Sequence, residues 1–87
     1  PSAASPSAAA NPALTGADLR AAQKEAAALE RRIEKLEKEV SRAKIALADH
    51  DQSDYAGLSA EMSRISALEA ERDETEERWF ALIEQIG

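Results

Sequence analysis

One apolar repeat constrains this chain more than any other feature of its sequence. In the first half, apolar residues recur at alternating steps of three and four through nine positions: Leu19, Ala22, Ala26, Leu29, Ile33, Leu36, Val40, Ala43 and Leu47. This spacing places all of them on one narrow face of a helix, which is typical of the seam of a coiled coil. The repeat therefore predicts that these side chains pack against another helix rather than around a pocket.

A second, less regular apolar series follows after six polar residues, 49–54, that favour a turn. Its members are Tyr55, Leu58, Met62, Ile65, Leu68, Trp79, Leu82 and Ile86, with two polar residues, Arg72 and Thr75, at the positions between Leu68 and Trp79. The 3-3 step from Ile65 to Leu68 predicts a local phase shift in this helix. Because a short loop makes consecutive helices pack antiparallel, the predicted fold class is all-α, an antiparallel two-helix coiled-coil hairpin.

The segment boundaries follow from composition and from capping residues. The first thirteen residues contain only Pro, Ser, Ala and Asn, so we expect a flexible, disordered linker there. Thr15, with Asp18 in the capping-box position, is the predicted N-cap of the first helix, and Ser53 or Asp54 that of the second. The predicted division is a linker at 1–13 and a hairpin at 14–87, with a helix at about 16–48, a turn at 49–54 and a helix at about 55–86.

Folding the chain about this turn pairs residues whose numbers sum to about 105. Trp79 then lies opposite Ala26, whose small side chain leaves room for the indole. Arg72 lies opposite Ile33, and we expect its guanidinium to reach one of the nearby glutamates Glu30, Glu34 or Glu37.

Several function classes are excluded or disfavoured by composition. The chain has no cysteine, a single histidine and no glycine-rich phosphate loop, so we expect no catalytic activity and no cofactor. His50 lies between Asp49 and Asp51, but a lone histidine among loop carboxylates is more typical of a solvated turn than of a metal site. No apolar run approaches the ~18 residues that a membrane-spanning helix needs. Because the sequence lacks an initial Met, we expect a fragment of a longer protein.

Charge is divided unevenly between the two predicted helices. The first, residues 16–48, carries eight basic and six acidic residues, whereas residues 54–86 carry three basic and nine acidic ones. Five cations fall on adjacent outer positions of the first helix: Lys24, Arg31, Lys35, Lys38 and Arg42. We call them the basic stripe. They could follow a phosphate backbone, or they could be solubilising residues paired along the helix, as Glu34 and Lys38 would be.

The sequence also resembles a known family. The residues that carry the resemblance are the run Glu30 to Val40 (ERRIEKLEKEV), the turn that follows Leu47-Ala48-Asp49, Tyr55, and the run Glu77 to Leu82 (ERWFAL). Together they are similar to the C-terminal coiled-coil domain of ABC-F ATPases, especially the Uup-like branch. The usual pattern there is an R-I-E-x-L-E-x-E helix, an Asp-rich turn and a terminal W-x-x-L. The resemblance covers about residues 14–87.

This resemblance implies a cytoplasmic protein with two ATP-binding cassettes and a non-catalytic C-terminal hairpin that contacts DNA, ribosomal RNA or the ribosome. The basic stripe is then the expected nucleic-acid contact, since the chain is acidic overall. The alternative is a protein-interaction or oligomerisation module without nucleic-acid binding, in which the edge around Arg72, Thr75 and Phe80 docks another helix. Partners on the first hypothesis are nucleic acid or the ribosome and the ATPase domains, together with weak self-association.

Overall fold

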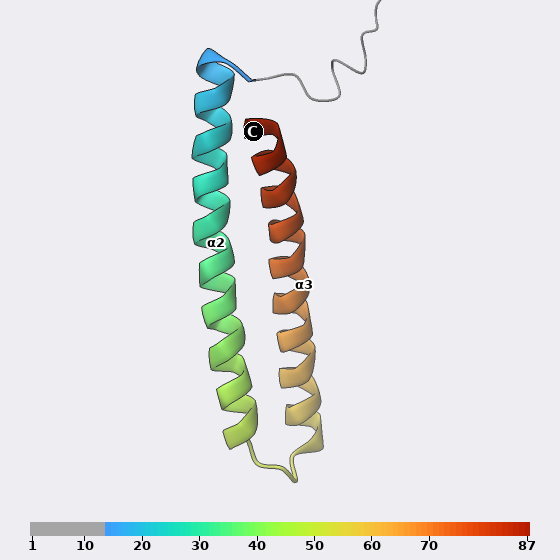
Figure 1. Cartoon of the computed structure of the whole chain (residues 1–87). Coiled ribbons are helices and arrows are strands. Elements are labelled where there is room, and N and C mark those ends of the chain that lie inside the picture. Colours follow the sequence, from blue (N-terminus) through green and yellow to red (C-terminus); the bar gives the residue numbers. More distant parts are fainter. Residues whose placement is uncertain (1–13) are drawn as a thin grey trace, which may run out of the picture.

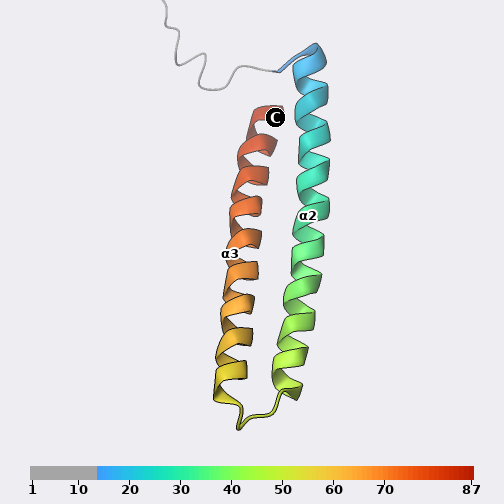
Figure 2. The ribbon, with the colours of Figure 1, turned by 180° about the vertical axis from the view of Figure 1, so that it is seen from behind.

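Two long helices make up the computed structural model over residues 14–87, the part of the chain that the structure describes: α2 (Gly16–Asp49) and α3 (Tyr55–Ile86). Figures 1 and 2 show them side by side and antiparallel, with the connecting loop at one end of the molecule and the C-terminus at the other. The predicted helical hairpin is confirmed. The predicted linker at 1–13 lies outside the described residues.

The nine-residue repeat of α2 forms the seam on its side of the hairpin. Ala22, Ala26, Leu36, Val40 and Ala43 are buried, and the other four members are half-buried, so none is exposed. Apolar side chains at this spacing leave water together only when a second helix covers them, and α3 is that helix.

The seam of α3 is more regular than the sequence predicted. Tyr55 and Met62 are 79% and 57% exposed, so their predicted place in the seam is wrong. Glu61 takes the position expected for Met62 and is half-buried. A series of half-buried and buried residues then follows an unbroken 3-4 alternation: Leu58, Glu61, Ile65, Leu68, Arg72, Thr75, Trp79, Leu82 and Ile86. The predicted phase shift at Ile65 is absent.

Ion pairs on the two edges of the hairpin reveal the register between the helices. Arg32 pairs with Glu71 and Glu25 with Arg78, and in both pairs the residue numbers sum to 103. On the other edge Lys44 pairs with Glu69, where the sum is 113. The seam lies between the two edges, so residues that face each other across it have numbers that sum to about 108. The predicted value of about 105 was therefore wrong by nearly one helical turn.

The corrected register changes the surroundings of Trp79. It places Trp79 opposite Leu29 rather than Ala26, and Ala26 opposite Leu82. The indole Nε1 donates a hydrogen bond of 3.0 Å to Oε2 of Glu30, the residue next to Leu29. Because helical side chains lean toward the N-terminus of their own helix, Trp79 leans toward the loop end of α2 and away from Ala22.

Two N-caps were predicted, and the structure forms one of them through a side chain. Asp54 caps α3, since its Oδ1 accepts a hydrogen bond of 3.1 Å from the backbone N–H of Gly57. Thr15 is the N-cap residue of α2, but its side chain makes no capping hydrogen bond, and the predicted capping box is absent. The carbonyl of Thr15 instead accepts from the backbone N–H groups of Asp18 and Leu19.

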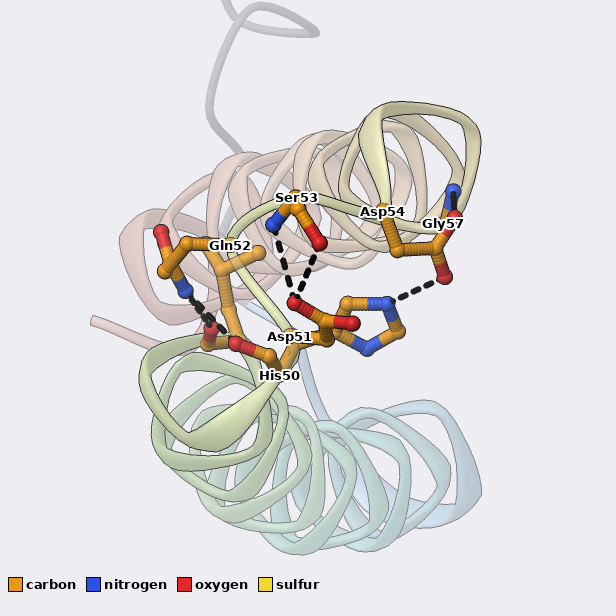
Figure 3. Close-up of polar contacts among 7 residues, drawn as sticks. His50, Asp51, Gln52, Ser53, Asp54 and Gly57 are labelled. Carbon is orange, nitrogen blue, oxygen red and sulfur yellow. Dashed lines mark hydrogen bonds and ion pairs between the residues drawn. The ribbon is translucent and has the colours of Figure 1, made fainter.

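The loop is held by its own polar side chains (Figure 3). Nε2 of His50 lies 2.8 Å from Oδ2 of Asp54, and Oδ1 of Asp51 accepts from both the backbone N–H and the hydroxyl of Ser53. The hydrogen bond with His50 is the largest cause that lowers the pKa of Asp54, followed by the Gly57 amide. The pKa of Asp51 is lowered chiefly by the backbone N–H of Ser53.

Candidate nucleic-acid interface

The basic stripe lies on the outer face of α2, turned away from the seam. All five of its side chains are exposed. Arg31, Lys35, Lys38 and Arg42 follow one another at steps of four, three and four, so they form one continuous row, and Lys24 precedes Arg31 by seven residues. From Lys24 to Arg42 the stripe extends ~27 Å along the helix axis.

Within residues 14–87 no member of the basic stripe forms an ion pair or a side-chain hydrogen bond with another side chain. Four other cations do: Arg32, Lys44 and Arg78 pair with carboxylates across the hairpin, and Arg72 pairs with its neighbour Asp73. Three of these four cations join the two helices, whereas the basic stripe lies free on the outer face of α2. A row of unpaired cations attracts phosphates.

Arg72 and Thr75, the two polar residues predicted for the α3 seam, are hydrogen-bonded within α3. The guanidinium of Arg72 donates to Oδ1 of Asp73 at 3.1 and 3.2 Å, so the predicted partners on α2 were wrong. This hydrogen bond raises the pKa of Arg72. Thr75 is buried and donates to the carbonyl of Glu71 at 2.7 Å, in the last turn before it. A docking edge that includes Thr75 is therefore not available on this surface.

No group of three or more His, Cys, Asp or Glu side chains in residues 14–87 could hold a metal ion. His50 is engaged with Asp54, and Asp51 is engaged with Ser53, so the loop carboxylates beside His50 serve the turn and the helix cap. Along α2 and α3 the basic stripe is accompanied by no aromatic side chain on which bases could stack. What the stripe can do chemically is bind phosphate oxygens through charge-assisted hydrogen bonds.

One surface was missed by the sequence interpretation. On the edge of the hairpin that also carries the Lys44–Glu69 pair, a shallow groove of about 330 Å³ opens between the helices. Its lining residues are Glu30, Ile33, Glu34, Glu37, Glu76, Trp79 and Phe80, and we call it the acidic groove. The sequence contained two of its features, the Trp79-Phe80 pair and glutamates seven apart at Glu30 and Glu37, but only the corrected register brings them together.

The family to which this geometry belongs is shown by comparison with known proteins. The family model described as ABC transporter C-terminal domain matches residues 19–84, which is nearly the whole hairpin. The chain belongs to this family. No curated protein and no solved structure matches it.

Membership in the ABC transporter C-terminal domain family makes this chain a non-catalytic helical accessory domain of an ABC protein. This confirms the family resemblance at the level of the ABC C-terminal domain and the expectation that the chain itself is not an enzyme. Assignment to the Uup-like branch stays a prediction. Over residues 14–87, neither helix is long and apolar enough to cross a membrane.

Proposed function

We propose that this ABC transporter C-terminal domain contacts nucleic acid through the basic stripe, on behalf of the ATPase domains of its parent chain in the cytoplasm. The observation that supports the proposal is the row of five exposed cations without an ion-pair partner among the described residues: Lys24, Arg31, Lys35, Lys38 and Arg42. Their side chains are free to bind phosphates without breaking any contact that holds the hairpin together.

The length of the basic stripe sets what it can contact. A row of ~27 Å corresponds to about eight base pairs of a duplex at 3.4 Å per step. With no aromatic residue along the row, the contact involves the phosphate backbone and reads no base sequence. A DNA duplex and a ribosomal RNA helix share this backbone chemistry, so the proposal covers both and the experiment distinguishes them.

The experiment is a fluorescence anisotropy titration of labelled duplex DNA and of duplex RNA of the same sequence, at several salt concentrations. If all five cations contact phosphates, log Kd should rise with log[salt] with a slope of about 4.5, so affinity should fall on the order of 500-fold between 50 and 200 mM salt. The duplex bound more tightly at equal salt identifies the natural class.

Charge reversal locates the contact. Changing Arg31, Lys35 and Lys38 together to Glu should remove binding. The single change Arg31→Glu should weaken binding about tenfold or more at low salt. The matched control is Ser59→Glu with Ser63→Glu, which lowers the net charge by the same two units at exposed positions of α3. Absence of binding at low salt, or equal losses for Arg31→Glu and this control, would overturn the proposal.

A further inference from the structure

The acidic groove has an aromatic surface that the hairpin itself does not cover. Phe80 is 61% exposed, and its ring meets that of Trp79 edge-on, with the ring centroids 5.1 Å apart. The hydrogen bond from Trp79 to Glu30 fixes the orientation of the indole. Ile33 of α2 completes the apolar part of the groove. An exposed phenylalanine beside a fixed indole is a preformed apolar contact surface.

The carboxylates around this surface are arranged differently from those elsewhere in the hairpin. One heptad nearer the loop on the same edge, Lys44 of α2 lies 3.3 Å from Glu69 of α3. One heptad further along, Glu37 of α2 and Glu76 of α3 occupy the equivalent flanking positions and line the same groove, so two like charges face each other there. This arrangement does not favour the hairpin, and it leaves the groove strongly negative.

No cation among the described residues neutralises the groove by an ion pair. On α3, the guanidinium of Arg72 is bonded to Asp73, and the charge of Glu76 is a smaller cause that raises the pKa of Arg72. On α2, Lys38 and Arg42 border a separate depression together with Glu34 and Glu37, without forming an ion pair to either. Four glutamates, Glu30, Glu34, Glu37 and Glu76, thus surround the aromatic pair.

We propose that the acidic groove binds an arginine-bearing basic segment of a protein partner. A guanidinium is planar and weakly hydrated, so it stacks on an aromatic face while its N–H groups donate to carboxylates on either side. The groove supplies both: the exposed ring of Phe80 beside Trp79, and carboxylates from both helices. The same four carboxylates repel phosphates, so this surface does not take nucleic acid, and it shares no residue with the basic stripe.

Trp79 makes the proposal directly measurable, since it is the only tryptophan of the chain. The experiment is a titration of the protein with a short blocked peptide of alternating alanine and arginine, followed by tryptophan fluorescence at low salt. We expect a saturable change in emission. The matched lysine peptide should bind more weakly because an ammonium lacks the planar fork, and the matched glutamine peptide should give no change.

Variants separate this groove from general attraction between a basic peptide and an acidic protein. The double variant Glu34→Gln with Glu37→Gln should weaken binding about tenfold, and Phe80→Ala should weaken it by a similar factor, since both sites are exposed and their change leaves the seam intact. The control is Glu74→Gln with Glu77→Gln, which removes the same charge from α3 outside the groove.

Three results would each overturn the proposal: no saturable emission change with the arginine peptide, equal weakening by the groove variants and the control pair, or the same emission change on adding duplex DNA. Circular dichroism of every variant checks that the helices are retained. A lysine peptide that binds as tightly as the arginine peptide would also count against the proposal, because binding would then depend on charge alone.

Discussion

Gly57 lies where two side chains of the loop approach the first turn of α3. An added Cβ at this position would collide with the carboxylate of Asp54 and with the imidazole of His50. Glycine in a helix ordinarily costs ~1 kcal/mol relative to alanine. At this position the missing side chain makes room for the cap of α3 and for the hydrogen bond between His50 and Asp54.

We therefore expect Gly57→Ala to destabilise the hairpin by about 1 kcal/mol, because loss of the cap and the collision outweigh the gain in helix propensity. Chemical denaturation followed by circular dichroism measures it. In a background that carries both His50→Ala and Asp54→Ala, the same change should stabilise the hairpin, since the collision partners are gone. Destabilisation in both backgrounds would show that another contact requires the glycine.

The lowered pKa of Asp54 gives stability a defined pH dependence. The folded state holds this pKa below its unfolded value of about 3.9. Asp54 therefore binds fewer protons when folded, and its contribution is complete above about pH 4 and is lost as the pH falls through the folded pKa. Asp51, whose pKa is also lowered, acts in the same direction.

We expect the unfolding midpoint of the wild type to exceed that of Asp54→Asn at neutral pH and the two to converge below about pH 4. Thermal unfolding at a series of pH values checks this. Because many other carboxylates titrate in the same range, the difference between the two proteins is the quantity to follow. A difference that stays constant down to pH 2 would mean that the charge of Asp54 does not contribute.

At the scale of the helix, the two edges of the hairpin carry different charge patterns. The edge with Arg32–Glu71 and Glu25–Arg78 alternates in sign across the helices. The other edge begins with Lys44–Glu69 and then places Glu37 at the level of Glu76. Glu37 and Glu76 both lie in the acidic groove. The charges proposed to bind a basic segment therefore also destabilise the hairpin there.

Glu76→Lys should accordingly stabilise the hairpin by about 0.2–1 kcal/mol at low salt, because it replaces the repulsion between Glu37 and Glu76 with an ion pair between Glu37 and the new lysine. Thermal unfolding at low and high salt measures the gain, which should shrink as salt is added. The matched control is Glu39→Lys on the opposite edge, where Arg64 lies nearby, and it should destabilise. A gain from both variants would show that only net charge matters.

Much of α2 could be predicted from the sequence because one physical rule decides it. Apolar residues at alternating steps of three and four must share a face, and all nine members of the repeat are buried or half-buried. The same rule failed twice in α3, at Tyr55, which is exposed, and at Met62, which it preferred to Glu61. A glutamate can bury its methylene stem while its carboxylate stays in water, so apolar character alone does not identify a seam residue.

The register could not be predicted because it is set by contacts between residues far apart in the sequence. Counting back from the middle of the loop treats both helices as equal, whereas the pairs Arg32–Glu71 and Lys44–Glu69 show that the helices are displaced from that register by nearly one turn. This displacement decides which residues meet in the acidic groove. The basic stripe was accessible to prediction because it depends on α2 alone, although its binding partner is a proposal.

At the scale of the whole molecule, the net charge of −6 opposes the proposed contact with nucleic acid. The basic stripe lies on α2, while α3 carries unpaired carboxylates such as Glu74 and Glu77 on its own outer face. With helix axes ~8–10 Å apart, the two outer faces lie ~20 Å from each other. At 0.15 M salt the screening length is ~8 Å, so the stripe acts almost independently of α3, whereas at 0.01 M it is ~30 Å and α3 repels the phosphates.

The double variant Glu74→Gln with Glu77→Gln should therefore raise affinity for a nucleic-acid duplex about fivefold at 0.01 M salt and leave it unchanged at 0.15 M. Anisotropy titrations of both proteins at the two salt concentrations provide the measurement. An equal gain at 0.15 M would place these glutamates beside the bound phosphates rather than across the hairpin. No gain at 0.01 M would mean that the duplex does not lie along α2, because repulsion between unscreened charges acts over the whole width of the molecule.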